Sequence, residues 1–307
     1  MPLIIGVLSG KGGVGKTTLV SNLGASLAKD FNKKIIVVDG NISASHLGLH
    51  LNLYEDFKFT LKDVLDGKAP VQHAIYIHPN TGLRVLTAPL KGENVKLEKI
   101  GRVLNQLKND YNLILVDTAP GLGREVLTVA RHLDGGIIVT TPDFPAVSDA
   151  LRTIKILKKI GVDILGIILN RVNEEKYELT ESEVESTCEY PCALVIPEDK
   201  NVPASIAKGI PLVIEKPNSN ASIAIKKLAA ALMGVEYQPK NFLYRVKRFF
   251  GLVDMQIPKI VLPAPKKVKY KAIGKKEKMR EELRKDIKEE LKKELIRRLR
   301  EKMAEKE

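Results

Sequence analysis

Cysteine is scarce in this chain, and long apolar runs are absent from it. Among 307 residues the only cysteines are Cys188 and Cys192. Two cysteines are too few for a disulfide framework, so we expect a reducing, cytoplasmic compartment. No stretch reaches the ~18–20 apolar residues that a membrane span needs. The sequence enters an apolar, strand-like segment at once, so we expect no signal peptide.

Positive charge is concentrated at one end of the chain. The formal net charge is +13, but residues 240–307 contain 23 Lys and Arg against 11 Asp and Glu, whereas residues 1–239 contain 27 against 26. A hydrophobic fraction of 44% is enough for a substantial core. A nearly neutral body with a basic tail favours a tail that meets an anionic surface, and we expect no specific binding to nucleic acid.

A glycine-rich segment near the N-terminus has the phosphate-loop pattern G-x-x-x-x-G-K-[ST]. An apolar run (3–8) precedes it and a helical pattern (19–28) follows it, as a phosphate loop requires. Glycines let the backbone bend around a triphosphate, and successive N–H groups then point at the anion. Lys16 should reach the β- and γ-phosphates of ATP, and Thr17 should ligate Mg²⁺. The residues expected to contact nucleotide here are Gly10, Lys11, Gly12, Gly13, Val14, Gly15, Lys16, Thr17 and Thr18.

Two further apolar runs end in an aspartate. Residues 33–39 end at Asp39, and residues 112–117 end at Asp117 in the manner of a Walker B strand. Mg²⁺ keeps several of its own waters, so we expect Asp117 to hold the ion through water, with Thr17 as the other metal-binding residue.

Strand-like runs alternate with helical patterns along most of the chain, which predicts an α/β fold: a three-layer P-loop NTPase sandwich with a mainly parallel sheet. The nucleotide belongs at the carboxyl ends of the strands. Strands are expected at 3–8, 33–39, 83–87, 112–117, 136–140, 164–171 and 193–199, and helices at 19–28, 61–65, 95–107, 146–160, 204–209 and 217–233. The expected domains are an ATPase domain (1–238), an amphipathic helix (239–253), a Pro/Lys-rich linker (254–274) and a charged helical tail (275–307).

Lys11 lies inside the phosphate loop, in K-G-G-V-G-K-T-T, and this segment resembles the deviant Walker A motif of the MinD/ParA family of ATPases. The resemblance extends over residues 2–253. It implies an ATP-closed homodimer in which Lys11 crosses to the partner's nucleotide. It also implies that Gly121 offers its N–H to the γ-phosphate. Adenine would be read by the Asn170-Arg171 pair and by the loop of Pro197, Glu198 and Asp199.

The first switch departs from the family pattern, because Asp39-Gly40-Asn41 replaces Asp-x-Asp. Asparagine can orient a water molecule but cannot take its proton, so we expect slow hydrolysis with Asn41 or Asp39 orienting water. His46 is left out of the catalytic set, since a lone histidine is more often structural. The expected catalytic residues are Lys11, Lys16, Asp39, Asn41 and Asp117.

The two cysteines have three residues between them, whereas related iron–sulfur carriers use pairs with two residues between them. We therefore expect Cys188 and Cys192 to be ordinary buried residues.

Residues 240–253 combine an apolar helical face with Lys and Arg, as in a helix that lies at a membrane surface. The segment also resembles the C-terminal membrane-targeting helix of MinD proteins. Two copies in a dimer would bind an anionic membrane by avidity. An ordinary terminal helix packed on the core is the alternative. The residues expected to enter the membrane surface are Phe242, Leu243, Val246, Phe249 and Phe250.

These observations favour a MinD-type ATPase that dimerises with ATP, associates peripherally with the membrane, and positions partner proteins or cell-division machinery through an unknown activator or cargo. Three alternatives stay open. They are a ParA-like DNA-partitioning ATPase, an iron–sulfur carrier of Mrp type, and a scaffold that binds nucleotide without turnover.

Overall fold

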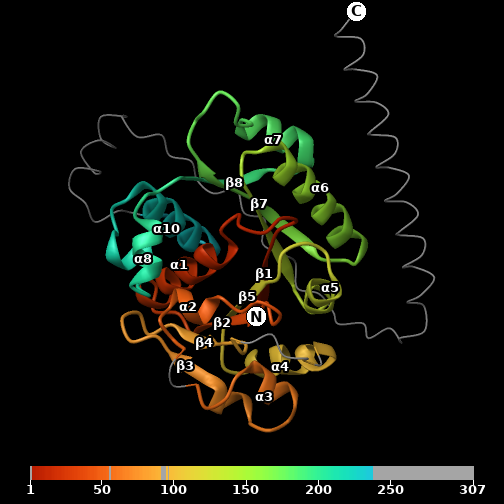
Figure 1. Cartoon of the computed structure of the whole chain (residues 1–307), viewed down its shortest axis with the longest axis vertical. Coiled ribbons are helices and arrows are strands. Elements are labelled where there is room, and N and C mark those ends of the chain that lie inside the picture. The colour runs from red at the N-terminus through yellow and green to blue at the C-terminus, as the bar shows by residue number, and fades with distance from the viewer. Residues whose placement is uncertain (1, 55–56, 91–94, 96, 238–307) are drawn as a thin grey trace, which may run out of the picture. The chain divides into compact units, whose positions relative to one another are not determined.

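The structure is a computed structural model of the chain and describes residues 2–54, 57–90, 95 and 97–237 (Figure 1). The boundaries predicted beyond residue 238, and the five apolar residues predicted to enter a membrane, lie outside these residues. No helix in the described part of the chain is long and apolar enough to cross a membrane.

One sheet organises the described residues, and its strands follow the order β3-β4-β2-β5-β1-β6-β7-β8. All neighbouring strands run parallel except β3 and β4, which pair antiparallel. The strands are β1 (Leu3–Leu8), β2 (Ile35–Gly40), β3 (Ile75–Ile77), β4 (Arg84–Leu86), β5 (Leu113–Thr118), β6 (Gly135–Thr140), β7 (Asp163–Val172) and β8 (Cys192–Pro197). The predicted mainly parallel α/β fold is confirmed.

Helices cover both faces of the sheet, because alternate strand residues point to opposite sides. Ile4 and Leu8 join an apolar cluster with α3 to α7, whereas Ile5 and Val7 join a second cluster with α1, α2, α9 and α10. In Figure 1, α5, α6 and α7 lie on one side of the strands, and α1 and α10 on the other. The α-helices are α1 (Lys16–Lys29), α2 (Leu47–His50), α3 (Leu61–Leu65), α4 (Ile100–Leu107), α5 (Arg124–Ala130), α6 (Phe144–Lys159), α7 (Glu181–Cys188), α8 (Val202–Ala207), α9 (Leu212–Glu215) and α10 (Asn220–Leu232), with 3₁₀ turns at Val71–Ala74 and Leu97–Lys99.

Close packing of α1 fixes the loop that precedes it. Leu23 and Leu27 are fully buried on its inner face, and burying one such side chain stabilises the fold by about 1.5–3 kcal/mol. A Cβ on Gly24 would come 2.7 Å from Cγ2 of Val37 in β2, so the helix lies too near the sheet for any larger residue. The position of the α1 N-terminus relative to the strand ends is therefore set by the core.

The described elements depart from the sequence predictions mainly at the sheet's edge and at helix starts. Strand β3 was not predicted, since three residues give too short a pattern. The helix predicted from residue 95 begins at Ile100, after a 3₁₀ turn, and α5 and α7 were not predicted. Both are seven- or eight-residue helices, and such lengths give weak periodicity.

Candidate nucleotide site

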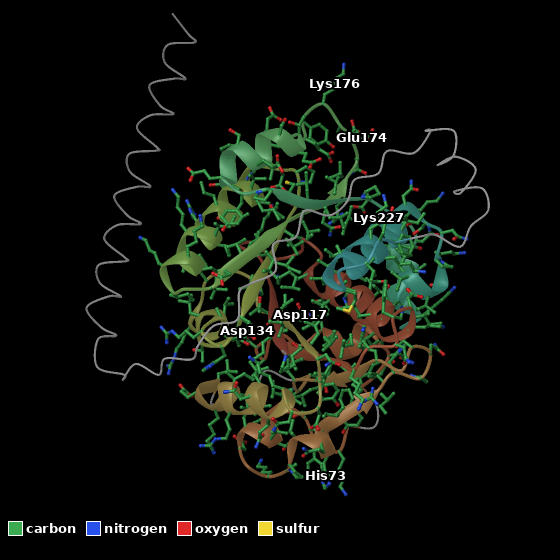
Figure 2. All side chains as sticks on the ribbon, turned by 180° about the vertical axis from the view of Figure 1, so that it is seen from behind. His73, Asp117, Asp134, Glu174, Lys176 and Lys227 are labelled. Carbon is green, nitrogen blue, oxygen red and sulfur yellow. The ribbon has the colours of Figure 1, made fainter. Side chains whose placement is uncertain are left out.

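The candidate site lies where three neighbouring parallel strands end. Strand β1 leads into the phosphate loop, while β2 and β5 carry Asp39 and Asp117 near their carboxyl ends. In the sheet register, Asp117 is the Cα partner of both Val7 and Asp39. Figure 2 shows Asp117 among the central strands, whereas Glu174 and Lys176 lie on a peripheral loop. The register thus brings together the loop and the carboxylates that the sequence predicted.

Two glycines of the phosphate loop adopt backbone conformations that other residues avoid. Gly13 has φ of 80° and Gly15 has φ of 93°, both in the left-handed region. A Cβ on Gly15 would also overlap the Asn170 amide, and a Cβ on Gly10 would overlap the backbone of Asp149. No side chain caps the start of α1, and its first turn contains no acidic residue. An anion bound by the loop amides and the positive end of α1 would therefore meet no competing acidic or capping side chain in that turn.

Lys16, the first residue of α1, has a side chain folded onto the loop. It is 8% exposed, and its Nζ donates a 2.7 Å hydrogen bond to Ser9 Oγ. Ser9 Oγ in turn donates to the Lys11 carbonyl at 2.7 Å. Burial lowers the pKa of Lys16, although the charge of Asp117 works in the opposite direction. A desolvated ammonium of this kind gains strongly from phosphate oxygens.

Thr17 and Asp117, the two residues that the sequence predicts to bind a metal ion, lie within hydrogen-bond distance of each other. Thr17 Oγ1 donates to Asp117 Oδ2 at 2.6 Å, and Asp117 Oδ1 is buried without a hydrogen-bond partner among the described residues. An orphaned carboxylate oxygen beside a hydroxyl is a hard, oxygen-only donor set, which fits Mg²⁺. Burial raises the pKa of Asp117 to about 6, while the Thr17 hydrogen bond and Lys16 hold it down. A divalent cation would relieve this cost of burial.

Asp39 and Asn41 have different surroundings in the switch loop, which we define as residues 41–45. Asp39 is fully buried and accepts hydrogen bonds from the Asn41 amide at 3.0 Å and the Ser45 hydroxyl at 2.7 Å. Asn41 donates through Nδ2 to the Ala44 carbonyl at 2.6 Å, and its buried Oδ1 has no partner among the described residues. The sequence suggested Asp39 or Asn41 for orienting water. In the structure, Asp39 accepts hydrogen bonds that organise the switch loop, whereas Asn41 Oδ1 is an acceptor that could bind a water molecule.

Lys11 lies at the exposed edge of the phosphate loop, apart from Lys16. Its Nζ is 3.2 Å from Asp143 Oδ1, and the two side chains are 47% and 42% exposed. Asp143 is the N-cap of α6 and accepts from the Ala146 amide at 3.0 Å and from Thr141 Oγ1 at 2.5 Å. Partial burial works to raise the pKa of Asp143, but the hydrogen bonds from Thr141, Ala146 and Lys11 lower it overall.

Gly121, in the loop after β5, also lies against the phosphate loop. Its φ is 79°, and its N–H donates to the Ser9 carbonyl at 2.9 Å. The amide that the resemblance assigned to the γ-phosphate is therefore engaged by Ser9 in this structure, and it would have to exchange partners to contact a nucleotide.

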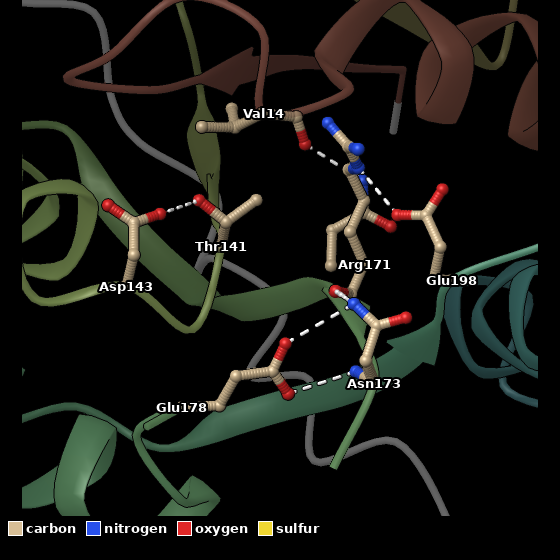
Figure 3. Close-up of polar contacts among 8 residues, drawn as sticks. Val14, Thr141, Asp143, Arg171, Asn173, Glu178 and Glu198 are labelled. Carbon is tan, nitrogen blue, oxygen red and sulfur yellow. Dashed lines mark hydrogen bonds and ion pairs between the residues drawn. The ribbon is translucent and has the colours of Figure 1, made fainter. Parts of the chain in front are cut away.

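The residues predicted to read the base lie on the β7 and β8 sides of the phosphate loop. Asn170 donates through Nδ2 to the Val14 carbonyl at 2.8 Å, and Arg171 Nε is 2.6 Å from Glu198 Oε2 (Figure 3). Arg171 has φ of 64°, where non-glycine residues carry strain. Pro197 ends β8, and Asp199 accepts from the Asn201 amide at 2.9 Å. The structure thus brings Asn170 to the phosphate loop and joins Arg171 to the loop of Pro197, Glu198 and Asp199.

Both cysteines are core residues, as predicted. Cys188 and Cys192 are 1% and 3% exposed and belong to one apolar cluster. Burial raises the pKa of the Cys188 thiol to about 11, so that this sulfur is a poor thiolate. Among the described residues, no group of three or more His, Cys, Asp or Glu side chains is placed to hold a metal ion.

Sequence reasoning missed the residues that hold the site together. Ser9 and Ser45 bind Lys16 and Asp39, Asp143 pairs with Lys11, and Glu125 contacts the switch loop. Only Asp143 had a readable signal, because an aspartate two residues before a proline is typical of a helix start.

Comparison with known proteins agrees with this geometry. A model of the ParA family, described as an NUBPL iron-transfer P-loop NTPase, matches residues 1–233. The chain belongs to the ParA family of P-loop NTPases. An uncharacterized ATP-binding protein of Methanocaldococcus jannaschii is 41% identical to this ParA-family protein over 241 residues, which are 78% of this chain and 90% of the relative.

Solved structures similar to this ParA-family protein include cell-division ATPases. Septum site-determining protein MinD of Pyrococcus horikoshii, complexed with Mg-ADP, is 32% identical with a TM-score of 0.72, and the match covers 80% of this chain and 99% of that one. MinD in the MinC:MinD complex of Aquifex aeolicus is 28% identical with a TM-score of 0.71, and the match covers 78% and 99%. The Mg-ADP complex is consistent with use of nucleotide and Mg²⁺ in the family, and Thr17 and Asp117 offer matching donors here.

Proposed function

We propose that this ParA-family protein is an ATPase of MinD type that dimerises when it binds ATP. The single observation that carries the proposal is the contrast between the two lysines of the phosphate loop. Lys16 is 8% exposed and directed into its own site, whereas the Lys11 side chain is 47% exposed and, within the described part of the chain, is held by a surface ion pair. One lysine serves the phosphates of its own subunit, and the other is able to reach those of a second copy.

ATP binding draws on groups that are already in place. The amides of the phosphate loop and the start of α1 would receive the β-phosphate. Lys16 would exchange its Ser9 hydroxyl partner for phosphate oxygens. Thr17 and Asp117 would hold Mg²⁺, which when bound neutralises charge at the β- and γ-phosphates.

Hydrolysis would depend on positioning a water molecule, because no residue of the switch loop can act as a strong base. Asn41 Oδ1 is the buried, unpartnered acceptor of this loop in the described structure. It can accept a hydrogen bond from water but cannot remove a proton, so we infer slow turnover until a partner acts. Phosphoryl transfer tolerates such a site, since catalysis rests mainly on alignment and charge stabilisation.

Dimer closure would require Lys11 to leave Asp143. Because both side chains are about half exposed, the ion pair is worth less than about 1 kcal/mol. A triphosphate of the second copy carries far more negative charge than one carboxylate. The contact therefore holds Lys11 at the edge of the site without preventing its transfer.

Membrane association and cell positioning form the finer part of the proposal. Residues 240–253 lie outside the described structure, and their sequence supports an amphipathic, cationic helix that binds in two copies. The MinD of Aquifex aeolicus was solved with MinC, which supports a protein partner or cargo for this chain as well.

Light scattering and liposome co-sedimentation of the full chain with ATP or ADP test the proposal. The wild type should form a dimer and sediment with anionic liposomes only with ATP, and removal of residues 240–253 should abolish sedimentation but not dimerisation. Lys11→Ala should bind ATP as a monomer, while Lys33→Ala, on the exposed turn after α1, should behave as wild type. A monomeric wild type with bound ATP would contradict the proposal.

An iron–sulfur carrier is the second candidate, because the matching family model is described by iron transfer. The burial of Cys188 and Cys192 in the core of one subunit argues against it. Iron bound by anaerobically purified protein would favour this candidate. DNA binding that falls steeply with salt and survives removal of residues 240–253 would instead favour a DNA-partitioning ATPase.

A further inference from the structure

Glu125 joins two loops that the proposed reaction needs together. It lies in the first turn of α5, and its carboxylate accepts hydrogen bonds from the switch loop. Oε1 accepts from the Ile42 amide and, at 3.2 Å, from the Ser43 amide, while Oε2 accepts from the Ser43 hydroxyl at 2.5 Å. One side chain thus holds two consecutive residues of the switch loop.

Several features of these contacts indicate that Glu125 anchors the switch loop. Hydrogen bonds to an ionised carboxylate are about twice as strong as neutral ones, and an acidic side chain is favoured in the first turn of a helix. The Ile42 side chain is 3% exposed and packs in the core, and Ser45 is tied to Asp39 at 2.7 Å. Asn41 therefore stands in a segment that is anchored at Asp39, at Ile42–Ser43 and at Ser45.

The loop after β5, which leads to Glu125, also contacts the phosphate loop. Gly121 donates its N–H to the Ser9 carbonyl at 2.9 Å, and Ser9 receives Lys16 at 2.7 Å. Glu125 follows Gly121 by four residues. The short segment 121–125 thus contacts the phosphate loop at one end and the switch loop at the other.

We propose that Glu125 is a positioning residue for ATP hydrolysis, which fixes the switch loop to the loop after β5 and thereby keeps Asn41 aligned with the γ-phosphate. The proposal rests on the proposed ATPase function and adds a residue that acts through Asn41. The core-facing side of α5 is formed by other residues, namely Val126, Val129 and Ala130.

Steady-state kinetics of the full chain with Mg-ATP test this role. Glu125→Ala should lower kcat by roughly 10- to 100-fold, as expected when alignment is lost, and should change the Kd for ATP less than about threefold, since it removes no phosphate contact. Ser43→Ala keeps both amide contacts and should lower kcat only a few-fold. Glu125→Gln keeps the acceptor oxygen without the charge and should be intermediate.

Arg124→Gln is the matched control, because Arg124 precedes Glu125 and pairs at 2.8 Å with Glu98 on the exposed surface. It should leave kcat unchanged. A kcat of Glu125→Ala equal to that of Arg124→Gln would overturn the proposal. The proposal would also be overturned if Glu125→Ala lost ATP affinity and melting temperature together with kcat, because that pattern marks a purely structural residue.

Amide hydrogen exchange supplies a readout independent of turnover. Exchange at residues 42–45 should be faster in Glu125→Ala than in the wild type, and unchanged in Arg124→Gln. Equal exchange in all three proteins would overturn the proposal. If the wild type binds ATP without hydrolysing it, the proposed function fails, while faster exchange in Glu125→Ala would still support the attachment of the two loops.

Discussion

Asp39 and Asp117 are Cα partners on the neighbouring strands β2 and β5, and both side chains are buried. Placing two carboxyl groups in one water-excluded site costs free energy when both are ionised. Burial first, and then the charge of Asp117, raise the pKa of Asp39 to about 8. The site is therefore prepared for positive charge, which Mg²⁺ would bring with the nucleotide.

The pH dependence of folding should report the Asp39–Asp117 pair. A carboxyl group with a raised folded pKa retains a proton that the unfolded chain releases above about 4, so its contribution to stability is lost as pH rises through the folded pKa of about 8 for Asp39. Burial lowers the pKa of His50, His78 and His132, and these histidines oppose the trend, an effect that fades above about pH 6.5 as the unfolded chain loses its histidine protons. Between pH 7 and 8 the free energy of unfolding without nucleotide should therefore fall, with a slope on the order of 1 kcal/mol per pH unit at most.

Urea denaturation between pH 7 and 8 measures this slope, and Asp39→Asn should flatten it. Asp66→Asn, a substitution in a surface ion pair, is the control and should leave the slope unchanged. A slope that is the same in the wild type and Asp39→Asn would show that Asp39 is ionised at neutral pH.

Asp143→Asn should strengthen ATP-dependent dimerisation. Asparagine caps helices as well as aspartate, so α6 should stay stable while Lys11 loses its ionic partner. Since a half-exposed ion pair is worth less than about 1 kcal/mol, the dimer dissociation constant should fall by at most about fivefold. Sedimentation velocity with ATP measures it. Asp143→Ala separates the two roles, because loss of the cap should cost about 1 kcal/mol of stability. Weaker dimerisation of Asp143→Asn would mean that Asp143 contacts the second copy.

Gly15→Ala should lose nucleotide binding and stability together. A non-glycine residue at φ of 93° is strained, and the added Cβ would displace the Asn170 amide. We expect a loss of about 1–3 kcal/mol in the free energy of unfolding and no measurable ATP binding by calorimetry. Gly12→Ala is a control for stability, since its Cβ would meet only Pro120 at 3.9 Å. Equal stability of the two variants would argue that the loop adopts another conformation in solution.

Cys188 should resist alkylation in the folded protein. Its thiol is buried, and its pKa is raised by burial to about 11, so little thiolate forms at pH 8 and reagents reach it slowly. Mass spectrometry after iodoacetamide treatment should find Cys188 unmodified in the native protein and modified in urea. Rapid native modification would indicate that α7 opens, and it would reopen the question of a metal ligand at this position.

Those parts of the site that depend on a local sequence pattern could be predicted from the sequence alone. The phosphate loop is one contiguous motif, and Asp39 and Asp117 each end an apolar strand, so their convergence follows from the parallel sheet. The antiparallel strand β3 could not be predicted in this way, because its position depends on pairing with Arg84–Leu86 and not on its own residues.

The contacts that hold the site in place were beyond sequence reasoning. Glu125 and Ser43 are 82 residues apart, and Lys11 and Asp143 are 132 apart. Such pairs depend on how helices pack on the sheet, and a single sequence does not reveal this. The partner assignments of Ser9 and Gly121 likewise required the three-dimensional structure.

The short antiparallel β3 has a consequence for how copies of this protein can associate. A border of three residues offers few main-chain groups to an incoming chain, so extension of the sheet from one molecule into another is disfavoured at that end. In the proposed ATP-dependent dimer, pairing of subunits would thereby be directed away from the β3 border and left to surfaces built from side chains, where a bound nucleotide would control association.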